Sequence, residues 1–301
     1  MEGQIIANRY VLKHKLGCGT FGDVFYAINR HDSTEGYAVK LEKPNPKRSY
    51  LQFEFKLYQS MNMNNNQPGV PLVYHLGSYK EYNAMVMEFL GPSLEDIMQH
   101  CGGKFSLKTT LMLADQCISR IQYVHSNNIV HRDIKPENFA MGRNDKSNIL
   151  YPIDFGISKK YRDNNNKHIP FTDNKNLVGT ARYSSINDHL GYEQSRRDDM
   201  ESLGYMFVYF MKGRLPWQGI TGHDKKEKYQ KILKKKQTLS CEELCSNIPI
   251  EFARYIELCR QLKFEEEPPY LEMRKMFWSV AKREGIKFDG IFDWYEMKQD
   301  K

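Results

Sequence analysis

Four polar residues in the middle of the chain have the types that phosphoryl transfer requires. Asp133, Lys135 and Asn138 lie close together, and Asp154 follows later. A carboxylate at position 133 can orient a hydroxyl nucleophile and accept its proton. The ammonium of Lys135 can neutralise charge on the transferring phosphoryl group, and the oxygens of Asn138 and Asp154 suit Mg²⁺, which prefers oxygen ligands. Positioning and neutralisation of charge supply most of the acceleration in such a reaction.

Two motifs contain these residues. His131–Asn138 reads HRDIKPEN, and Asp154-Phe155-Gly156 follows it. This order, downstream of a lysine, is typical of protein kinases and is highly specific. Each residue alone could be structural, because a lone aspartate in a turn is more often a cap than a base. Together the motifs predict phosphoryl transfer from ATP, with Mg²⁺ as a cofactor.

A glycine-rich segment near the N-terminus could bind the phosphates of a nucleotide. Gly17, Gly19, Gly22 and Val24 satisfy GxGxxGxV, a weak signal alone because dinucleotide-binding folds share it. A dinucleotide fingerprint opens a helix, whereas a strand-like run follows Gly22 here. The pattern therefore predicts a hairpin whose backbone amides approach phosphates. A plain glycine hairpin is the alternative.

The next strand carries a lysine of the kind that binds phosphates. In Tyr37-Ala38-Val39-Lys40, alternation points Ala38 and Lys40 to the same face. The small side chain leaves room for adenine, and the ammonium reaches the α- and β-phosphates. A lysine in a cleft needs a carboxylate to hold it, and Glu54 on the following helix is the candidate. An exposed lysine at the end of a strand is the alternative.

Hydrophobic patterns predict an α+β fold with a small β-rich lobe before a larger helical lobe. The expected strands form one antiparallel sheet and are Tyr10–Leu16, Val24–Asn29, Gly36–Lys43, Leu72–Tyr79 and Ala84–Phe89. The expected helices are Ser49–Met61, Ser106–His125 with Ser106 as its N-cap, Asp198–Lys212, Glu227–Lys235, Ile250–Leu262 and Leu271–Glu284. We expect residues 1–301 to form one domain, with an N-lobe over about 1–88, a hinge near 88–91 and a C-lobe over about 92–296.

The composition predicts an intracellular globular protein. The chain of 301 residues has 40% hydrophobic and 27% charged residues, and no apolar run is long enough to span a bilayer. The first residues lack the apolar core of a signal peptide. Six cysteines without paired spacing indicate neither disulfides nor a zinc site. We expect a cytoplasmic or nuclear location.

Lysines crowd the stretch from Lys225 to Lys236, within a net charge of +7. Such a run favours acidic partners, namely acidic peptides, phosphate, nucleic acid or an anionic membrane. A solvated helix face is the alternative. A nucleic-acid-binding protein is not favoured, because no base-reading module is present. Nuclear targeting by the same run stays open.

Several strings point to one branch of the kinases. Ser185-Ile186-Asn187 stands where most protein kinases have Ala-Pro-Glu, Leu90–Asp96 reads LGPSLED and Leu215–Gly219 reads LPWQG. In these strings, from near Tyr10 to Trp294, the chain resembles the casein kinase 1 family of eukaryotic serine/threonine protein kinases. The vaccinia-related and tau-tubulin kinases fit less well. The resemblance implies a bilobal protein kinase fold and transfer of the ATP γ-phosphoryl group to serine or threonine of acidic or phosphate-primed proteins.

The resemblance also implies roles near the nucleotide and the catalytic loop. Met87 would be the gatekeeper, with Glu88, Phe89 and Leu90 as the hinge to adenine. Asp199 matches the kinase aspartate that opens a long helix behind the catalytic loop. We expect Asp199 to accept backbone hydrogen bonds there.

The resemblance also implies that basic side chains beside the cleft hold the phosphorylated or acidic residue that precedes the target serine or threonine. The matching positions are Arg182 and Lys228, with Gly219 nearby. Converging cations are what a phosphate requires. A second anion site is implied at Arg132, Lys159 and Lys175. The arginine of that site could instead brace the activation segment.

The resemblance further implies activity without phosphorylation of the activation segment. We expect a monomer. A pseudokinase scaffold that binds nucleotide or partners is the main alternative. It is disfavoured because Lys40, Asp133, Asn138 and Asp154 are all intact. Turnover of ATP with Mg²⁺ separates the two hypotheses.

Overall fold

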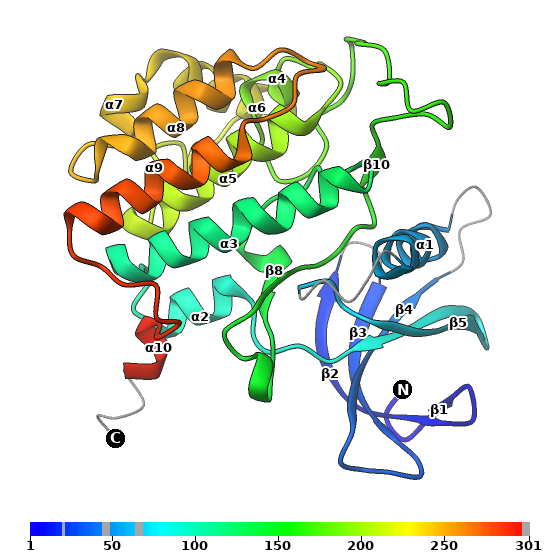
Figure 1. Cartoon of the computed structure of the whole chain (residues 1–301). Helices are drawn as coiled ribbons and strands as arrows, with labels where there is room; N and C mark the ends of the chain where they lie inside the picture. The colour runs from blue at the N-terminus through cyan, green and yellow to red at the C-terminus, as the bar shows by residue number, and fades with distance from the viewer. Residues whose placement is uncertain (20–21, 44–48, 64–68, 297–301) are drawn as a thin grey trace. The chain divides into compact units, whose positions relative to one another are not determined.

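The computed structural model describes residues 1–19, 22–43, 49–63 and 69–296 (Figure 1). Thr20 and Phe21 of the glycine-rich motif, and the end of the expected domain at 297–301, lie outside these residues. The chain divides into two compact units. Unit 1 comprises Met1–Gly91 and Ala140–Gly156, and unit 2 comprises Pro92–Phe139 and the chain from Ile157 onward.

Unit 1 is built on a six-stranded antiparallel sheet with the strand order β1-β2-β3-β4-β6-β5. Its strands are β1 (Ile5–Ile6), β2 (Tyr10–Gly19), β3 (Gly22–Asn29), β4 (Gly36–Glu42), β5 (Val73–Tyr79) and β6 (Tyr82–Glu88). Alternate side chains of these strands, among them Leu12, Val39 and Val86, form a buried core. The five predicted strands are confirmed, with small shifts at their ends. The sequence did not indicate β1, because two residues are too few to show alternation.

Helix α1 (Tyr50–Met63) is attached to this sheet through its first turn. Glu42, at the end of β4, is buried, and its Oε1 accepts the N–H groups of Tyr50 at 3.0 Å and Leu51 at 3.2 Å. Its Oε2 accepts the hydroxyl of Ser49 at 3.0 Å. The first N–H groups of a helix have no intrahelical partner, and a carboxylate there also complements the helix dipole. Strand β4 therefore fixes the start of α1.

The segment Ala140–Gly156 groups with unit 1, although the sequence pattern places all residues after 92 in the helical lobe. The N–H of Gly91 donates to the carbonyl of Met141 at 2.7 Å. Lys146 pairs with Glu88 at 3.2 Å. These contacts tie the segment to the end of β6, and no local pattern in the sequence predicts them.

Unit 2 is helical. Its helices are α2 (Leu94–His100), α3 (Leu107–Ser126), α4 (Ile186–His189), α5 (Arg196–Lys212), α6 (Lys225–Thr238), α7 (Cys241–Leu244), α8 (Ile250–Gln261), α9 (Tyr270–Arg283) and α10 (Asp293–Glu296). Helix α3 packs against α5 and α9, and α5 packs against α8 (Figure 1). Helix α5 is buried along most of its length, which makes it the centre of this unit. The predicted α+β kinase fold, with an antiparallel sheet followed by a helical region, is confirmed.

Short elements complete the structure. They are β7 (Ile129–Val130) paired with β10 (Lys159–Lys160), β8 (Phe139–Met141) paired with β9 (Leu150–Pro152), and the 3₁₀ turns η1 (Pro136–Asn138) and η2 (Asn144–Lys146). All six cysteines are free thiols. Across the described ranges, no helix is both long enough and apolar enough to cross a membrane.

The sequence pattern did not indicate α2. Its N-terminus is a capping box, in which the Ser93 hydroxyl accepts the N–H of Asp96 at 3.2 Å. The Asp96 carboxylate in turn accepts the N–H of Ser93, also at 3.2 Å. The signal is present in the sequence as Ser93-x-x-Asp96, but seven residues are too few for a clear helical period.

Ser106 is the N-cap of α3, as predicted. Its hydroxyl accepts the N–H of Thr109 at 3.1 Å and donates to Asp293 Oδ1 at 2.6 Å. Ser106→Ala should lower the free energy of unfolding by about 1 kcal/mol, the usual contribution of an N-cap serine. Urea denaturation followed by circular dichroism measures this change. Ser126→Ala, at the exposed end of the same helix, is the control and should change it by less than about 0.5 kcal/mol. Equal losses in the two variants would contradict the assigned cap.

Candidate active site

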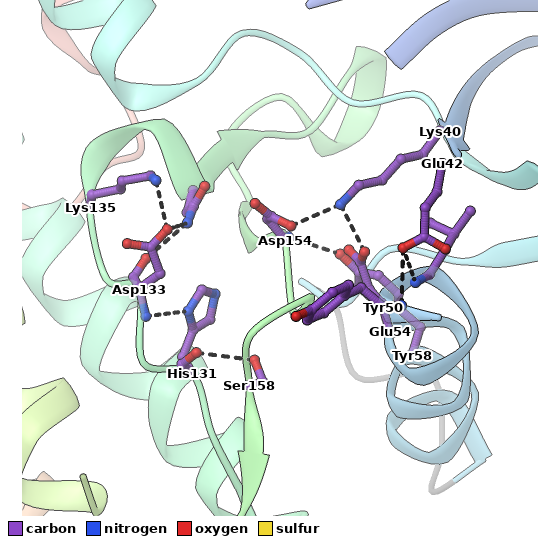
Figure 2. A network of polar contacts seen from close by, with 12 residues as sticks. Lys40, Glu42, Tyr50, Glu54, Tyr58, His131, Asp133, Lys135, Asp154 and Ser158 are labelled. Carbon is purple, nitrogen blue, oxygen red and sulfur yellow. Dashed lines mark hydrogen bonds and ion pairs between the residues drawn. The ribbon is translucent and has the colours of Figure 1, made fainter. Parts of the chain in front are cut away.

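In unit 1 the side chain of Lys40 lies between two carboxylates. Its Nζ is 2.8 Å from Glu54 Oε2 and 2.8 Å from Asp154 Oδ1, as Figure 2 shows. Lys40 is 7% exposed and Glu54 only 1%. Burial alone would lower the pKa of Lys40, but the two carboxylates outweigh it and raise the pKa. The ammonium therefore stays charged and fixed in direction.

Helix α1 also holds Asp154. The residue has φ +64°, a left-handed conformation that is uncommon outside glycine. Its N–H donates to the hydroxyl of Tyr58 at 3.2 Å, and the ring of Phe155 packs edge-on against the ring of Tyr58 with centroids 5.1 Å apart. Tyr58 lies one turn after Glu54, so one helix fixes both Lys40 and the Asp154-Phe155 pair.

The glycine-rich motif lies at the end of the β2–β3 hairpin, where Gly17 pairs with Val24 and Gly19 with Gly22. At Gly22, φ is +150° and a Cβ would lie 1.9 Å from the carbonyl oxygen of Leu41. Packing against β4 therefore requires this glycine. At Gly17 a Cβ would meet nothing within 4 Å. The fold does not require a glycine at position 17, which agrees with a position kept open for a ligand.

The predicted adenine contacts lie along β4 and β6. Ala38 and Met87 are register partners, and each is 9% exposed. The Glu88 carboxylate accepts the N–H of Leu72 at 3.1 Å, so this side chain serves the sheet. The backbone N–H and carbonyl of Leu90 form no hydrogen bond within the part of the chain that the structure describes. These two groups are available to an adenine ring.

In unit 2 the carboxylate of Asp133 is held by three side chains. Its Oδ2 accepts from Lys135 Nζ at 2.6 Å (Figure 2). The same oxygen accepts from Asn138 Nδ2 at 3.1 Å. Its Oδ1 accepts the hydroxyl of Thr180 at 2.8 Å. Asp133 is 9% exposed. A carboxylate fixed in this way, with a cation beside it, can orient a hydroxyl group and take its proton.

Hydrogen bonds from its amide nitrogen fix the orientation of the Asn138 side chain. That nitrogen donates to the carbonyl of Asp133 at 2.9 Å as well as to its carboxylate, so the oxygen is the atom left for a ligand. This oxygen and the carboxylate of Asp154 are donors of the type that Mg²⁺ takes. Within the described ranges no cluster of three or more His, Cys, Asp or Glu side chains could hold a metal. Each of the two side chains, taken by itself, thus offers oxygen atoms of the kind that Mg²⁺ binds.

The buried carboxylate of Asp199 fixes the backbone of the catalytic loop. It accepts the N–H groups of His131 at 2.7 Å and Arg132 at 2.9 Å, and His125 Nε2 lies 2.9 Å away. Burial raises the pKa of Asp199, but the hydrogen bond and charge of His125 and the backbone donors outweigh it, so the pKa lies below its usual value. The predicted role of Asp199 as an acceptor of backbone hydrogen bonds is confirmed.

Thr180 is a site residue that sequence reasoning missed. Besides its bond to Asp133, its hydroxyl lies 3.4 Å from Lys135 Nζ. The preceding Gly179 has φ +91°, and a Cβ there would lie 2.4 Å from the carbonyl oxygen of Arg132. Only glycine lets the segment approach the catalytic loop so closely. The Gly-Thr pair was visible in the sequence, but no spacing rule links position 180 to position 133.

The residues of the proposed anion site lie on neighbouring parts of unit 2. The half-buried guanidinium of Arg182 lies 5.7 Å and 5.8 Å from the ring centroids of two tyrosines. The carbonyl of Arg182 accepts the indole N–H of Trp217 at 2.7 Å, two residues before Gly219. Lys228 is exposed near the start of α6.

The residues of the second anion site have other partners. Lys159 and Lys175 approach Glu193 Oε2 at 2.8 Å and 3.9 Å. Arg132 Nε donates to the carbonyl of Ile157 at 2.7 Å. A carboxylate thus lies between the two lysines, and the arginine braces the start of the activation segment.

One comparison with known proteins bears on this arrangement. The family model described as the protein kinase domain matches residues 10–273, from the start of β2 into α9. The chain therefore belongs to the protein kinase domain family, and its activity is that of a protein phosphotransferase. The family implies ATP as the phosphoryl donor and, typically, Mg²⁺.

Gly179→Ala tests the close approach of the activation segment to Asp133. The Cβ would press on Arg132, and a non-glycine residue at φ +91° costs about 1–3 kcal/mol. We expect at least about a tenfold loss of kcat in a peptide phosphorylation assay, because a small displacement of a positioned group is enough. Gly102→Ala is the matched control, since it has φ +78° and an added Cβ would meet nothing within 4 Å. The same kcat in both variants would show that the approach is not needed.

Proposed function

We propose that residues 1–301 act as one casein kinase 1-like domain that transfers the γ-phosphoryl group of ATP to serine or threonine of acidic or phosphate-primed proteins. The arrangement of Asp133, held by Lys135, Asn138 and Thr180, is the observation that carries the catalytic part. The choice of serine or threonine and the subfamily rest on the strings that include Ser185-Ile186-Asn187.

Unit 1 carries the nucleotide contacts of this proposal. Lys40 would bind the α- and β-phosphates, and its ammonium is already aligned by Glu54. The backbone of Leu90 would bind adenine against Ala38. Asp154 would hold a Mg²⁺ ion, which would neutralise charge on the phosphates.

Unit 2 carries the acceptor contacts. Asp133 would orient the substrate hydroxyl and take its proton, while Lys135 would neutralise charge on the transferring group. The hydroxyl of Thr180 donates a hydrogen bond directly to Asp133. This contact supports activity without phosphorylation of the activation segment.

Ser185, in the string that stands where most protein kinases have Ala-Pro-Glu, makes two hydrogen bonds through its hydroxyl. Ser185 caps α4, since its hydroxyl accepts the N–H of Asp188 at 3.0 Å. The same hydroxyl donates to Asp198 Oδ1 at 2.7 Å, near the start of α5. The segment is therefore held by a serine, and its change from the common motif is compatible with an active kinase.

The preference for an upstream anion rests on Arg182 and Lys228. Arginine can bind a phosphate through two parallel hydrogen bonds, and a lysine on the next element adds charge. The rings beneath Arg182 restrict its guanidinium before a substrate arrives. For the second anion site, the contact of Arg132 with Ile157 supports a bracing role instead.

Asp133→Asn tests the catalytic assignment. The phosphatase-treated wild type should phosphorylate a serine peptide with Mg-ATP, and the variant should lose about 10²- to 10⁴-fold in kcat, because the amide cannot accept the proton. Incorporation of radiolabelled phosphate measures both. An inactive wild type, or an undiminished variant, would favour a scaffold that only binds nucleotide.

Selectivity is tested with a serine peptide and its version that carries phosphoserine three residues upstream. The wild type should prefer the phosphorylated peptide in kcat/KM. Arg182→Ala should lower that preference about tenfold, since a hydrogen bond to a charged group contributes about 1.5–3 kcal/mol. Lys226→Ala, exposed on α6, is the control for removal of a charge. An equal preference in the wild type and Arg182→Ala would remove the anion site and keep the kinase.

A further inference from the structure

The last lysine of the run from 225 to 236 does not lie on a solvated face. Lys236 is 0% exposed, whereas Lys234 and Lys235 are exposed. It lies one turn after Ile232, which is also buried, on the inner stripe of α6. The interpretation of the whole run as surface charge is therefore wrong at this position. A buried amine needs hydrogen-bond partners, since burial without them costs several kcal/mol.

The partners of Lys236 are backbone carbonyls of the activation segment. Its Nζ donates to the carbonyl of Ala181 at 3.0 Å and to that of Ser184 at 2.5 Å, and it lies 3.3 Å from His189 Nε2. Burial lowers the pKa of His189 to about 3, so its ring is neutral and adds no positive charge beside the amine. The Lys236 side chain thus bonds backbone carbonyls that lie 55 and 52 positions earlier in the sequence.

Trp217 contacts the same turn of the activation segment, residues 180–184. Its indole N–H donates to the carbonyl of Arg182, and Lys236 Nζ lies 5.0 Å from the centroid of the Trp217 ring. Within the turn, the carbonyl of Thr180 accepts the N–H groups of residues 183 and 184 at 2.9 Å and 3.0 Å. The carbonyls of residues 181 and 184 accept hydrogen bonds from Lys236, and that of residue 182 accepts one from Trp217.

This turn carries two groups of the proposed reaction. Thr180 contacts Asp133, and Arg182 belongs to the proposed anion site. Helix α6 carries the other proposed cation, Lys228, about 12 Å along its axis from Lys236 at 1.5 Å per residue. Lys236 therefore joins the helix that carries one cation to the turn that carries the other.

We infer that Lys236 is a positioning residue for the protein substrate, because it holds the 180–184 turn against α6. The inference rests on the proposed function and adds to it a residue that does not touch the substrate. The contacts of Lys236 described above lie in unit 2, whereas the proposed contacts with adenine and with the α- and β-phosphates lie in unit 1. The KM for peptide should therefore depend on Lys236, and the KM for ATP should not.

The position requires donors and not a fixed charge. Burial lowers the pKa of Lys236 to about 7; the charges of Glu201 and Asp188 act in the opposite direction, and that of Arg260 in the same direction. Either form of the amine has at least two N–H groups for the two carbonyls. Substitution should therefore act through the lost donors.

Lys236→Met tests the inference, because methionine keeps the length and loses every donor. We expect the KM for the phosphorylated peptide to rise at least about tenfold, with the KM for ATP within about twofold of the wild type. Lys236→Arg restores donors and should recover part of the peptide KM. Lys235→Met, the exposed neighbour, controls for removal of a lysine from α6 and should leave both constants unchanged.

Instability of the variant does not imitate this readout, because irreversibly unfolded enzyme leaves both KM values unchanged and reversible unfolding would not raise the KM for peptide alone. Trp217→Phe, which loses the N–H bonded to Arg182, should raise the KM for peptide in the same selective way. A change of both constants together, or of neither, in Lys236→Met and Trp217→Phe would overturn the inference. A wild type that phosphorylates no peptide would instead overturn the proposed function and the inference with it.

Discussion

The catalytic loop of unit 2 depends on one buried charge. The Asp199 carboxylate is 1% exposed, and a buried carboxylate is tolerated only where donors surround it. The N–H groups of His131 and Arg132 meet this need, and Arg132 is held at φ +70° while doing so. The loop then turns so that Asp133 faces Lys135 and Thr180. A structural carboxylate thus sets the direction of the carboxylate proposed to take the proton.

Local chemistry explains which residues could be predicted. Asp133, Asn138 and Asp154 follow from the needs of phosphoryl transfer, and the strands from alternation over five or more residues. Glu42, Thr180 and Lys236 could not be found in this way. Each acts through partners that the fold brings from elsewhere, such as α1 for Glu42 and residues 181 and 184 for Lys236. In a sequence they look like an ordinary acid, a loop hydroxyl and one lysine of a basic run.

The activation segment is held at several points by the chain itself. Its start is braced by Arg132 at Ile157, its middle meets Asp133 through Thr180, and its end is capped by Ser185. These contacts come from the catalytic loop and from α5, which are themselves buried. The chain's own groups make these contacts, whereas in some other kinases new arginine–phosphate pairs order the activation segment.

Strand β4 holds α1 at two places, and this limits how the protein could be regulated. Glu42 binds the first turn of the helix, and Lys40 binds Glu54 in its middle. Breaking a buried ion pair costs about 3–5 kcal/mol, and about 1.4 kcal/mol corresponds to a factor of ten in population. A form with α1 displaced would then be populated on the order of one molecule in a few hundred or fewer. An inhibitor that works by moving this helix would have to bind the displaced form at least about a hundred times more tightly than the form seen here.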